Sequence, residues 1–188
     1  MNREVRRILE AVRSGGRDVD DALVKLKEKP FEDIGYAKVD LHRKVRQGAA
    51  EVIYGAGKTA EQLTGIVTAM KNGGQDTILI TRLSPEAAAQ VGQTHALDYH
   101  PDARAGVVGK LPPADGLGTI VIATGGTSDI PVAEEAALTA QILGNHVTRL
   151  YDVGVAGLHR TFAHLDEIMT ASQILANARM EAALASVI

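Results

Sequence analysis

The most informative chemically capable residues lie in the loop Ala123-Thr124-Gly125-Gly126-Thr127-Ser128-Asp129. An uninterrupted apolar run precedes this loop and a helix-forming stretch follows it, so the loop joins a buried strand to a helix start. Glycines let backbone N–H groups approach an anion, and the helix N-terminus adds partial positive charge. Thr127 and Ser128 supply hydroxyl donors, and Asp129 is a helix cap, a ribose ligand or a proton carrier. The loop therefore predicts an anion site at the carboxyl end of a strand.

A second glycine-rich turn is Gly55-Ala56-Gly57-Lys58-Thr59, which follows a short apolar strand. The P-loop pattern fails here, because Val52 stands where that pattern requires glycine. A strand, a glycine-rich turn and a lysine at a helix start can still hold a phosphate, although a plain strand-to-helix turn explains these residues equally well. Thr59 and Gln62 have the spacing of a capping box.

A third loop, Tyr151 to Arg160, follows the next predicted strand. The β–α–β order places it at the same sheet edge as the first loop. Four of its residues are candidates for a site. Asp152, His159 and Arg160 have ionisable side chains, and Gly154 allows backbone conformations that other residues avoid. The remaining histidines show no metal-ligand spacing, which argues against a transition-metal site.

These loops require elements that position them. Apolar periodicity and capping residues predict helices over 2–13, from Asp18 or Asp20 to 26, over Ile34–Gln47, from Thr59 to 72, from Ser84 onward, from Ser128 or Asp129 to Leu143, and over 158–170. Strands are expected at 51–54, 77–81, 96–100, 105–108, 118–123, 146–153 and 172–176.

This order predicts an α/β protein with two domains. Residues 1–116 form a small mixed α+β domain, and residues 117–188 form a doubly wound parallel-sheet domain, separated by the linker Pro112-Pro113-Ala114-Asp115-Gly116. Three strands make a thin sheet, so we expect further strands or a homo-oligomeric partner to complete it.

Composition excludes several classes of function. The 188 residues include no Cys and no Trp, and the net charge is -3. Disulfides, cysteine–zinc sites and a cysteine nucleophile are thereby excluded for this chain, and neither nucleic acid nor a membrane is an expected partner. No apolar run of about 18 residues exists, and the charged start lacks a secretory pattern, so we expect a cytoplasmic protein.

Three segments together resemble one family: Asp40 to Gln62, Ala123 to Glu135, and Tyr151 to Arg160. Their combination and order are similar to the LarB family of carboxylases in nickel-pincer cofactor biosynthesis. The second half also resembles aminoimidazole ribonucleotide carboxylase, the PurE type, and this resemblance implies a flavodoxin-like fold for residues 117–188.

The resemblance implies a substrate, nicotinic acid adenine dinucleotide. It implies carboxylation of the pyridinium ring by CO2 or bicarbonate and cleavage of the phosphoanhydride, which releases AMP and gives pyridinium-3,5-dicarboxylate mononucleotide. No tightly bound cofactor is expected, with Mg2+ as an assisting phosphate counter-ion.

The resemblance also implies roles for residues. The catalytic candidates are Glu181, Asp129 and His159. The mononucleotide side is assigned to Gly125, Gly126, Thr127, Ser128, Asp129, Asp152, Gly154 and Arg160. The adenylate side is assigned to Asp40, Arg43, Arg46, Gly55, Gly57, Lys58 and Thr59.

The chain departs from the family pattern in its last residues. Arg179 and Ala182 stand where the family has glycines, and a side chain there would obstruct a close backbone approach. The family's catalytic cysteine lies beyond the position of Ile188, so we expect a truncated version of the family plan. Two alternatives remain: a non-catalytic nucleotide-binding relative, and a PurE-type carboxylase or mutase, whose mechanism needs no cysteine.

Overall fold

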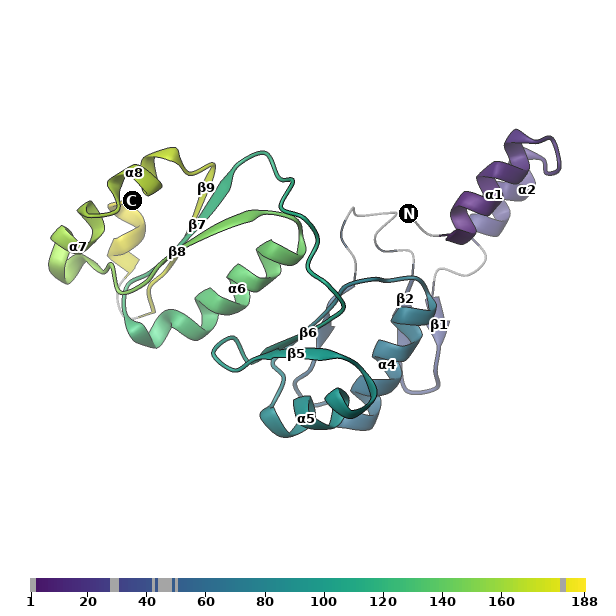
Figure 1. Cartoon of the computed structure of the whole chain (residues 1–188), viewed down its shortest axis with the longest axis horizontal. Coiled ribbons are helices and arrows are strands. Elements are labelled where there is room, and N and C mark those ends of the chain that lie inside the picture. The colour runs from purple at the N-terminus through teal and green to yellow at the C-terminus, as the bar shows by residue number, and fades with distance from the viewer. Residues whose placement is uncertain (1–2, 28–30, 42, 44–48, 50, 180–181) are drawn as a thin grey trace.

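The computed structural model describes residues 3–27, 31–41, 43, 49, 51–179 and 182–188. It is an α/β protein with a helical hairpin, a two-stranded ribbon, a four-stranded mixed sheet and a three-stranded parallel sheet (Figure 1). The predicted fold class is confirmed. The hairpin consists of α1 (Arg3–Arg13) and α2 (Val19–Lys27), with Ile8 and Ala22 buried. Asp18 accepts a hydrogen bond from the backbone N–H of Asp20, as expected of a cap.

The predicted helix over Ile34–Gln47 is wrong in its first half. Strands β1 (Phe31–Asp33) and β2 (Lys38–Asp40) pair antiparallel there. The Asp33 carboxylate accepts from the N–H of Gly35, whose φ of 88° is left-handed, and this local turn chemistry competes successfully with helix formation. Apart from residue 43, positions 42–48 lie outside the described residues.

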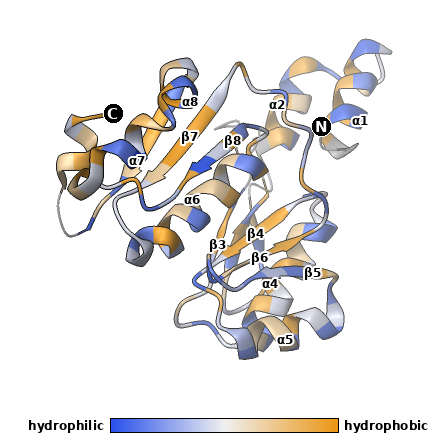
Figure 2. Cartoon of the chain, turned by 60° about the vertical axis from the view of Figure 1, so that its left-hand side comes forward, coloured by the Kyte–Doolittle hydropathy of each residue, from blue (hydrophilic) through white to orange (hydrophobic). Residues whose placement is uncertain are grey.

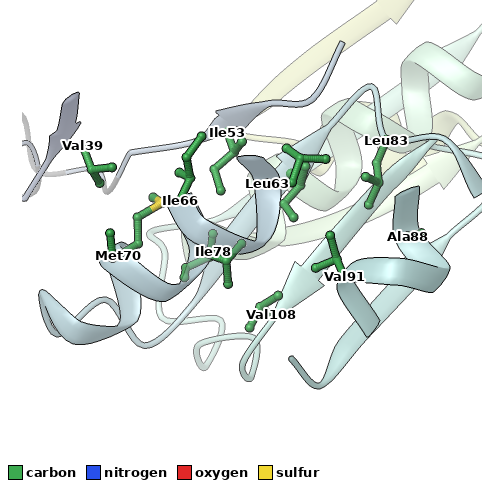
Figure 3. Packing of buried hydrophobic residues seen from close by; sticks show 13 residues of the cluster. Val39, Ile53, Leu63, Ile66, Met70, Ile78, Leu83, Ala88, Val91 and Val108 are labelled. Atoms are coloured by element: carbon green, nitrogen blue, oxygen red, sulfur yellow. The ribbon is translucent and has the colours of Figure 1, made fainter. Parts of the chain in front are cut away.

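The four-stranded sheet has the order β3-β4-β6-β5. Its elements are β3 (Ile53–Tyr54), α4 (Ala60–Asn72), β4 (Ile78–Thr81), α5 (Pro85–Thr94), β5 (Leu97–His100) and β6 (Ala105–Val108). β3 and β4 are parallel, and the other two pairings are antiparallel. Leu63, Met70 and Val91 pack from the helices onto Ile78 and Val108 (Figure 3). The capping box at Thr59 is confirmed, and so is the cap at Ser84.

The parallel sheet has the order β8-β7-β9. Its elements are β7 (Thr119–Thr124), α6 (Ile130–Ile142) after a 3-10 turn, β8 (His146–Leu150), α7 (Leu158–Phe162), α8 (Leu165–Thr170) and β9 (Gln173–Asn177). The predicted strand 146–153 ends earlier, because Asp152 adopts a φ of 57° and the chain turns across the end of β7. The predicted helix 158–170 is broken at Ala163 and His164 into α7 and α8.

Helix α6 lies between the two larger sheets (Figure 2). Ala133 and Ala137 pack against Ile122 of β7, whereas Leu138 joins a cluster with Leu79 and Val107 of the other sheet. Small residues on one side of α6 permit a close approach to β7. α6 therefore connects both sheets to the loop that precedes it. The division at residues 116 and 117 falls between the two sheets and stays an interpretation. No helix among the described residues is long and apolar enough to cross a membrane.

Candidate functional site

Three loops meet at the carboxyl edge of the parallel sheet. β7, β8 and β9 run in the same direction and end at Thr124, Leu150 and Asn177. The loop 125–129 leaves the central strand, and the loops after β8 and β9 flank it. The structure thus brings two of the three predicted loops together, at the position where parallel α/β sheets bind ligands.

Backbone and side-chain hydrogen bonds hold the first two loops against each other. Thr124 is fully buried, and its hydroxyl oxygen accepts from the N–H of Asp152 at 2.9 Å. The carbonyl of Thr124 accepts from Val153 N–H at 2.9 Å. A Cβ added at Gly154 would lie 2.2 Å from the carbonyl oxygen of Gly125, so glycine is required by this close approach.

Asp129 links the first loop to the loop after β9. It is 3% exposed, and its Oδ2 accepts from Gly126 N–H at 3.1 Å while its Oδ1 accepts from Arg179 N–H at 3.2 Å. Of the three roles open to Asp129, a side-chain cap of α6 is not formed, and its bond from the Gly126 N–H belongs instead to the 3-10 turn that precedes the helix. Asp129 instead orders the site by joining two loops that are 50 residues apart in sequence.

The open part of the first loop is formed by small and hydroxyl residues. Thr127 and Ser128 are exposed, and a Cβ at Gly126 would meet no atom within 4 Å. Backbone N–H groups in the first turn of a helix have no partner inside it. This segment can therefore offer hydroxyl and amide donors to an anion without rearranging the core.

The loop after β8 presents a charged pair. Arg160 Nη1 lies 2.6 Å from Asp152 Oδ2, and both side chains are partly exposed. His159 is exposed, and it lies close to Gly157. The sequence reasoning missed Thr161, whose buried hydroxyl donates to the Val153 carbonyl at 2.7 Å and fixes α7 on the loop.

A further polar cluster beside this edge was also missed. Glu134 Oε1 accepts from Arg149 Nε at 3.0 Å and from the Tyr151 hydroxyl, and Arg149 also donates to Gln141 at 3.2 Å. Burial acts to raise the pKa of Glu134, but the hydrogen bonds from Tyr151 and Arg149 outweigh it, so this pKa lies below its ordinary value. Burial, and then the Glu134 carboxylate, raise the pKa of Tyr151. The seven-residue spacing of Glu134 and Gln141 on one helix face was the available signal.

The turn at Gly55 lies at the edge of the other sheet. Gly55 N–H donates to the Thr81 carbonyl at 2.7 Å, and Gly57 has a φ of 77°. Lys58 Nζ donates to the Tyr54 carbonyl at 2.7 Å, and Thr59 caps α4. Among the residues that the structure describes, no hydrogen bond or ion pair joins this turn directly to the loop 125–129.

The remaining candidate site residues lie in or near segments that the structure describes only in part. Asp40 closes β2, and its N–H donates to Glu51 Oε2 at 2.7 Å. Arg43 is exposed. Arg46 and Glu181 lie outside the described residues. Within the described part of the chain, no group of three or more His, Asp or Glu side chains is placed to hold a metal.

Comparison with known proteins agrees with this architecture. Residues 31–110 match the family model described as the LarB/PurE-like N-terminal domain. The whole chain is also similar to an uncharacterized protein of Methanocaldococcus jannaschii, with 33% identity over 202 residues, covering 77% of that protein. The chain therefore belongs to the LarB/PurE-like proteins, a carboxylase-related family.

Proposed function

We propose that this chain binds nicotinic acid adenine dinucleotide, whose pyridinium ring would be carboxylated by CO2 or bicarbonate with the help of a cysteine thiolate that these 188 residues do not supply. Cleavage of the phosphoanhydride then releases AMP and leaves pyridinium-3,5-dicarboxylate mononucleotide. Family membership supports a carboxylase-related chemistry. The observation that carries the proposal is the meeting of the loops after β7, β8 and β9 at one sheet edge, ordered by the buried Asp129.

The mononucleotide half is assigned to this edge. Thr127 and Ser128 are exposed where a phosphate would meet hydroxyls and first-turn amides. Arg160 is partly exposed and adds a guanidinium, which suits phosphate because it can donate two parallel hydrogen bonds. Its partner Asp152 can accept from a ribose hydroxyl. His159 is exposed beside them and is the candidate for proton transfer.

The adenylate half is assigned to the turn Gly55–Thr59 and the basic residue Arg43. The turn follows β3 and leads into the capped helix α4, so its backbone is held in a defined shape. Gly57 in a left-handed conformation gives the turn its curvature. The two halves of the substrate would thus contact different sheets.

Ligand-dependent stability tests this assignment. We expect nicotinic acid adenine dinucleotide to raise the thermal unfolding temperature more than aminoimidazole ribonucleotide does at equal concentration. A ligand at one hundred times its Kd stabilises a protein by about 2.7 kcal/mol, which is easily measured. Absent or equal protection by the dinucleotide would contradict the proposed substrate.

A turnover assay tests the chemistry separately. In the family, a cysteine thiolate is implied to add to the pyridinium ring, and this sequence holds no cysteine. We therefore expect no dicarboxylated product when the 188-residue chain is incubated with the dinucleotide and bicarbonate. Product formation would refute the requirement for cysteine, and carboxylation of aminoimidazole ribonucleotide would favour the PurE-type reaction.

A further inference from the structure

Within the described part of the chain, an ion pair joins the end of strand β4 to helix α6. Arg82 Nε lies 3.2 Å from Glu135 Oε2. Arg82 follows β4 of the four-stranded sheet, and Glu135 lies in α6, which begins at the loop 125–129. The Arg82 side chain remains 47% exposed, so the pair is open to solvent.

Arg82 stands beside the turn proposed for the adenylate half. β3 and β4 pair in parallel, with Tyr54 opposite Thr81, and Gly55 N–H donates to the Thr81 carbonyl. β4 and β6 pair antiparallel as far as Ile80 opposite Gly106, and Arg82 and Arg104 follow where this pairing ends. Leu83 N–H donates to the Arg104 carbonyl at 2.7 Å. The turn and both arginines therefore share one edge of the sheet.

The backbone of both arginines is unusual. Arg82 has a φ of 53° and Arg104 a φ of 48°, a conformation uncommon for residues other than glycine. Leu79 of β4 packs toward α6, whereas Ile78 and Ile80 pack toward α4 and α5. If side chains kept alternating between the two faces of the sheet, Arg82 would lie on the same face as Ile78 and Ile80. Its side chain instead reaches Glu135 of α6. The left-handed conformation thus accompanies a side chain directed toward the neighbouring domain.

The charges at this edge are not balanced locally. Arg82 is paired with Glu135, whereas Arg104 is exposed and takes part in none of the ion pairs formed among the described residues. The neighbouring Glu134 is already engaged by Arg149 and Tyr151. An anion bound at this edge would lower its positive charge.

The position also suits a ligand that reaches both sheets. Glu135 lies six residues after Asp129 on the same helix, which is about 9 Å along the helix axis at about 1.5 Å per residue. The guanidinium of Arg82 contacts that carboxylate, so helix α6 connects Arg82 with the loop proposed for the mononucleotide half.

We propose that Arg82, with Arg104 beside it, binds the adenylate-side phosphate of the dinucleotide, and that Arg82 leaves Glu135 to do so. This inference rests on the proposed function and names the residue that links its two halves. A guanidinium can exchange a carboxylate for a phosphate because both accept a pair of parallel N–H donors. Lys58 is less suited, since its ammonium cannot offer the planar pair of N–H donors of a guanidinium and one of its three donors is taken by the Tyr54 carbonyl.

Isothermal titration with two ligands tests the proposal: nicotinic acid adenine dinucleotide and nicotinic acid mononucleotide, which lacks the adenylate phosphate. Arg82→Asn is the informative variant, because asparagine tolerates the left-handed backbone while removing the cation. We expect it to weaken dinucleotide binding by roughly tenfold or more and to change mononucleotide binding by less than about twofold. Arg104→Asn should show the same selectivity with a smaller loss.

Glu135→Gln is the matched control. It removes the same ion pair from the other side but leaves the guanidinium in place, so dinucleotide binding should be unchanged or tighter. A merely structural ion pair predicts the opposite pattern, in which Arg82→Asn and Glu135→Gln lower the unfolding temperature equally and weaken both ligands alike. That pattern, or full dinucleotide affinity in Arg82→Asn, overturns the inference. A wild-type chain that binds no dinucleotide overturns the proposed function itself.

Discussion

The two glycine-rich turns look alike in sequence but are held in different ways. At Gly55–Thr59 the side-chain bonds are local: Thr59 and Gln62 cap each other, and Lys58 reaches the Tyr54 carbonyl four residues back. At Gly125–Asp129 one bond of the Asp129 carboxylate is local, to the Gly126 N–H, but the other is long-range, to the Arg179 N–H 50 residues away. The side-chain bonds of the first turn need only residues next to it in sequence, although its Gly55 N–H also donates to the Thr81 carbonyl of β4. The second loop depends on the assembled sheet, so its binding properties should respond to distant substitutions.

The largest effect is expected where the two loops of the parallel sheet touch. In Gly154→Ala the new Cβ would lie 2.2 Å from the backbone oxygen of Gly125. We expect a loss of about 3 kcal/mol in the free energy of unfolding, together with loss of nucleotide protection. Urea unfolding measures the first and thermal shift the second.

Gly126→Ala is the matched control for that substitution. Its Cβ would meet nothing within 4 Å, and the residue has an extended backbone with a φ of -153°. We expect a change in stability within about 0.5 kcal/mol. A destabilisation equal to that of Gly154→Ala would show that the close approach of the two loops is unimportant.

A smaller loss is expected for Asp129→Ala. The substitution leaves the N–H groups of Gly126 and Arg179 without their acceptor; a buried unsatisfied donor costs about 1–3 kcal/mol, and less here because Gly126 is half-buried and Arg179 is exposed. We expect about 2 kcal/mol of destabilisation in urea unfolding and weaker mononucleotide binding by titration calorimetry. Unchanged binding in a folded variant would contradict the ordering role of this carboxylate.

A comparable substitution in the Gly55–Thr59 turn should lower the free energy of unfolding by less. Thr59→Ala removes one half of the capping box, and loss of an N-cap costs about 1 kcal/mol. Thr59→Ser keeps the hydroxyl and should restore most of this stability. If Thr59→Ala destabilised the protein as much as Asp129→Ala, the contrast between local and long-range bonding would fail.

The smallest effect concerns acid stability. The pKa of Glu134 is lowered in the folded state, so its contribution is complete above its unfolded pKa, near 4.3, and is lost as the pH falls through the lower folded value. Below about pH 5 the free energy of unfolding should therefore fall more steeply with pH in the wild type than in Glu134→Gln. The difference between the two proteins should stay under about 1 kcal/mol, because the Glu134–Arg149 pair is partly exposed. Parallel pH profiles from urea unfolding would contradict this.

The helices and strands were predicted correctly where the pattern that indicates them spans only a few neighbouring residues. The box at Thr59 and Gln62, and Ser84 followed by Pro85, predicted the starts of α4 and α5 correctly. The apolar run before Thr124 predicted the buried central strand β7. The helix predicted from Ile34 failed because apolar spacing there does not distinguish a helix from a strand pair, and the turn at Gly35 decided the outcome.

Amino-acid order by itself determined the α/β class, the strand-to-helix turns and the family, because capping, periodicity and glycine placement act over a few residues. Only the tertiary structure decided that Asp129 serves a loop from β9 instead of its own helix, and that Arg82 meets Glu135 across two sheets. Those partners lie far apart in the chain. Their meeting follows from parallel strand pairing and from the packing of α6, which no short-range pattern encodes.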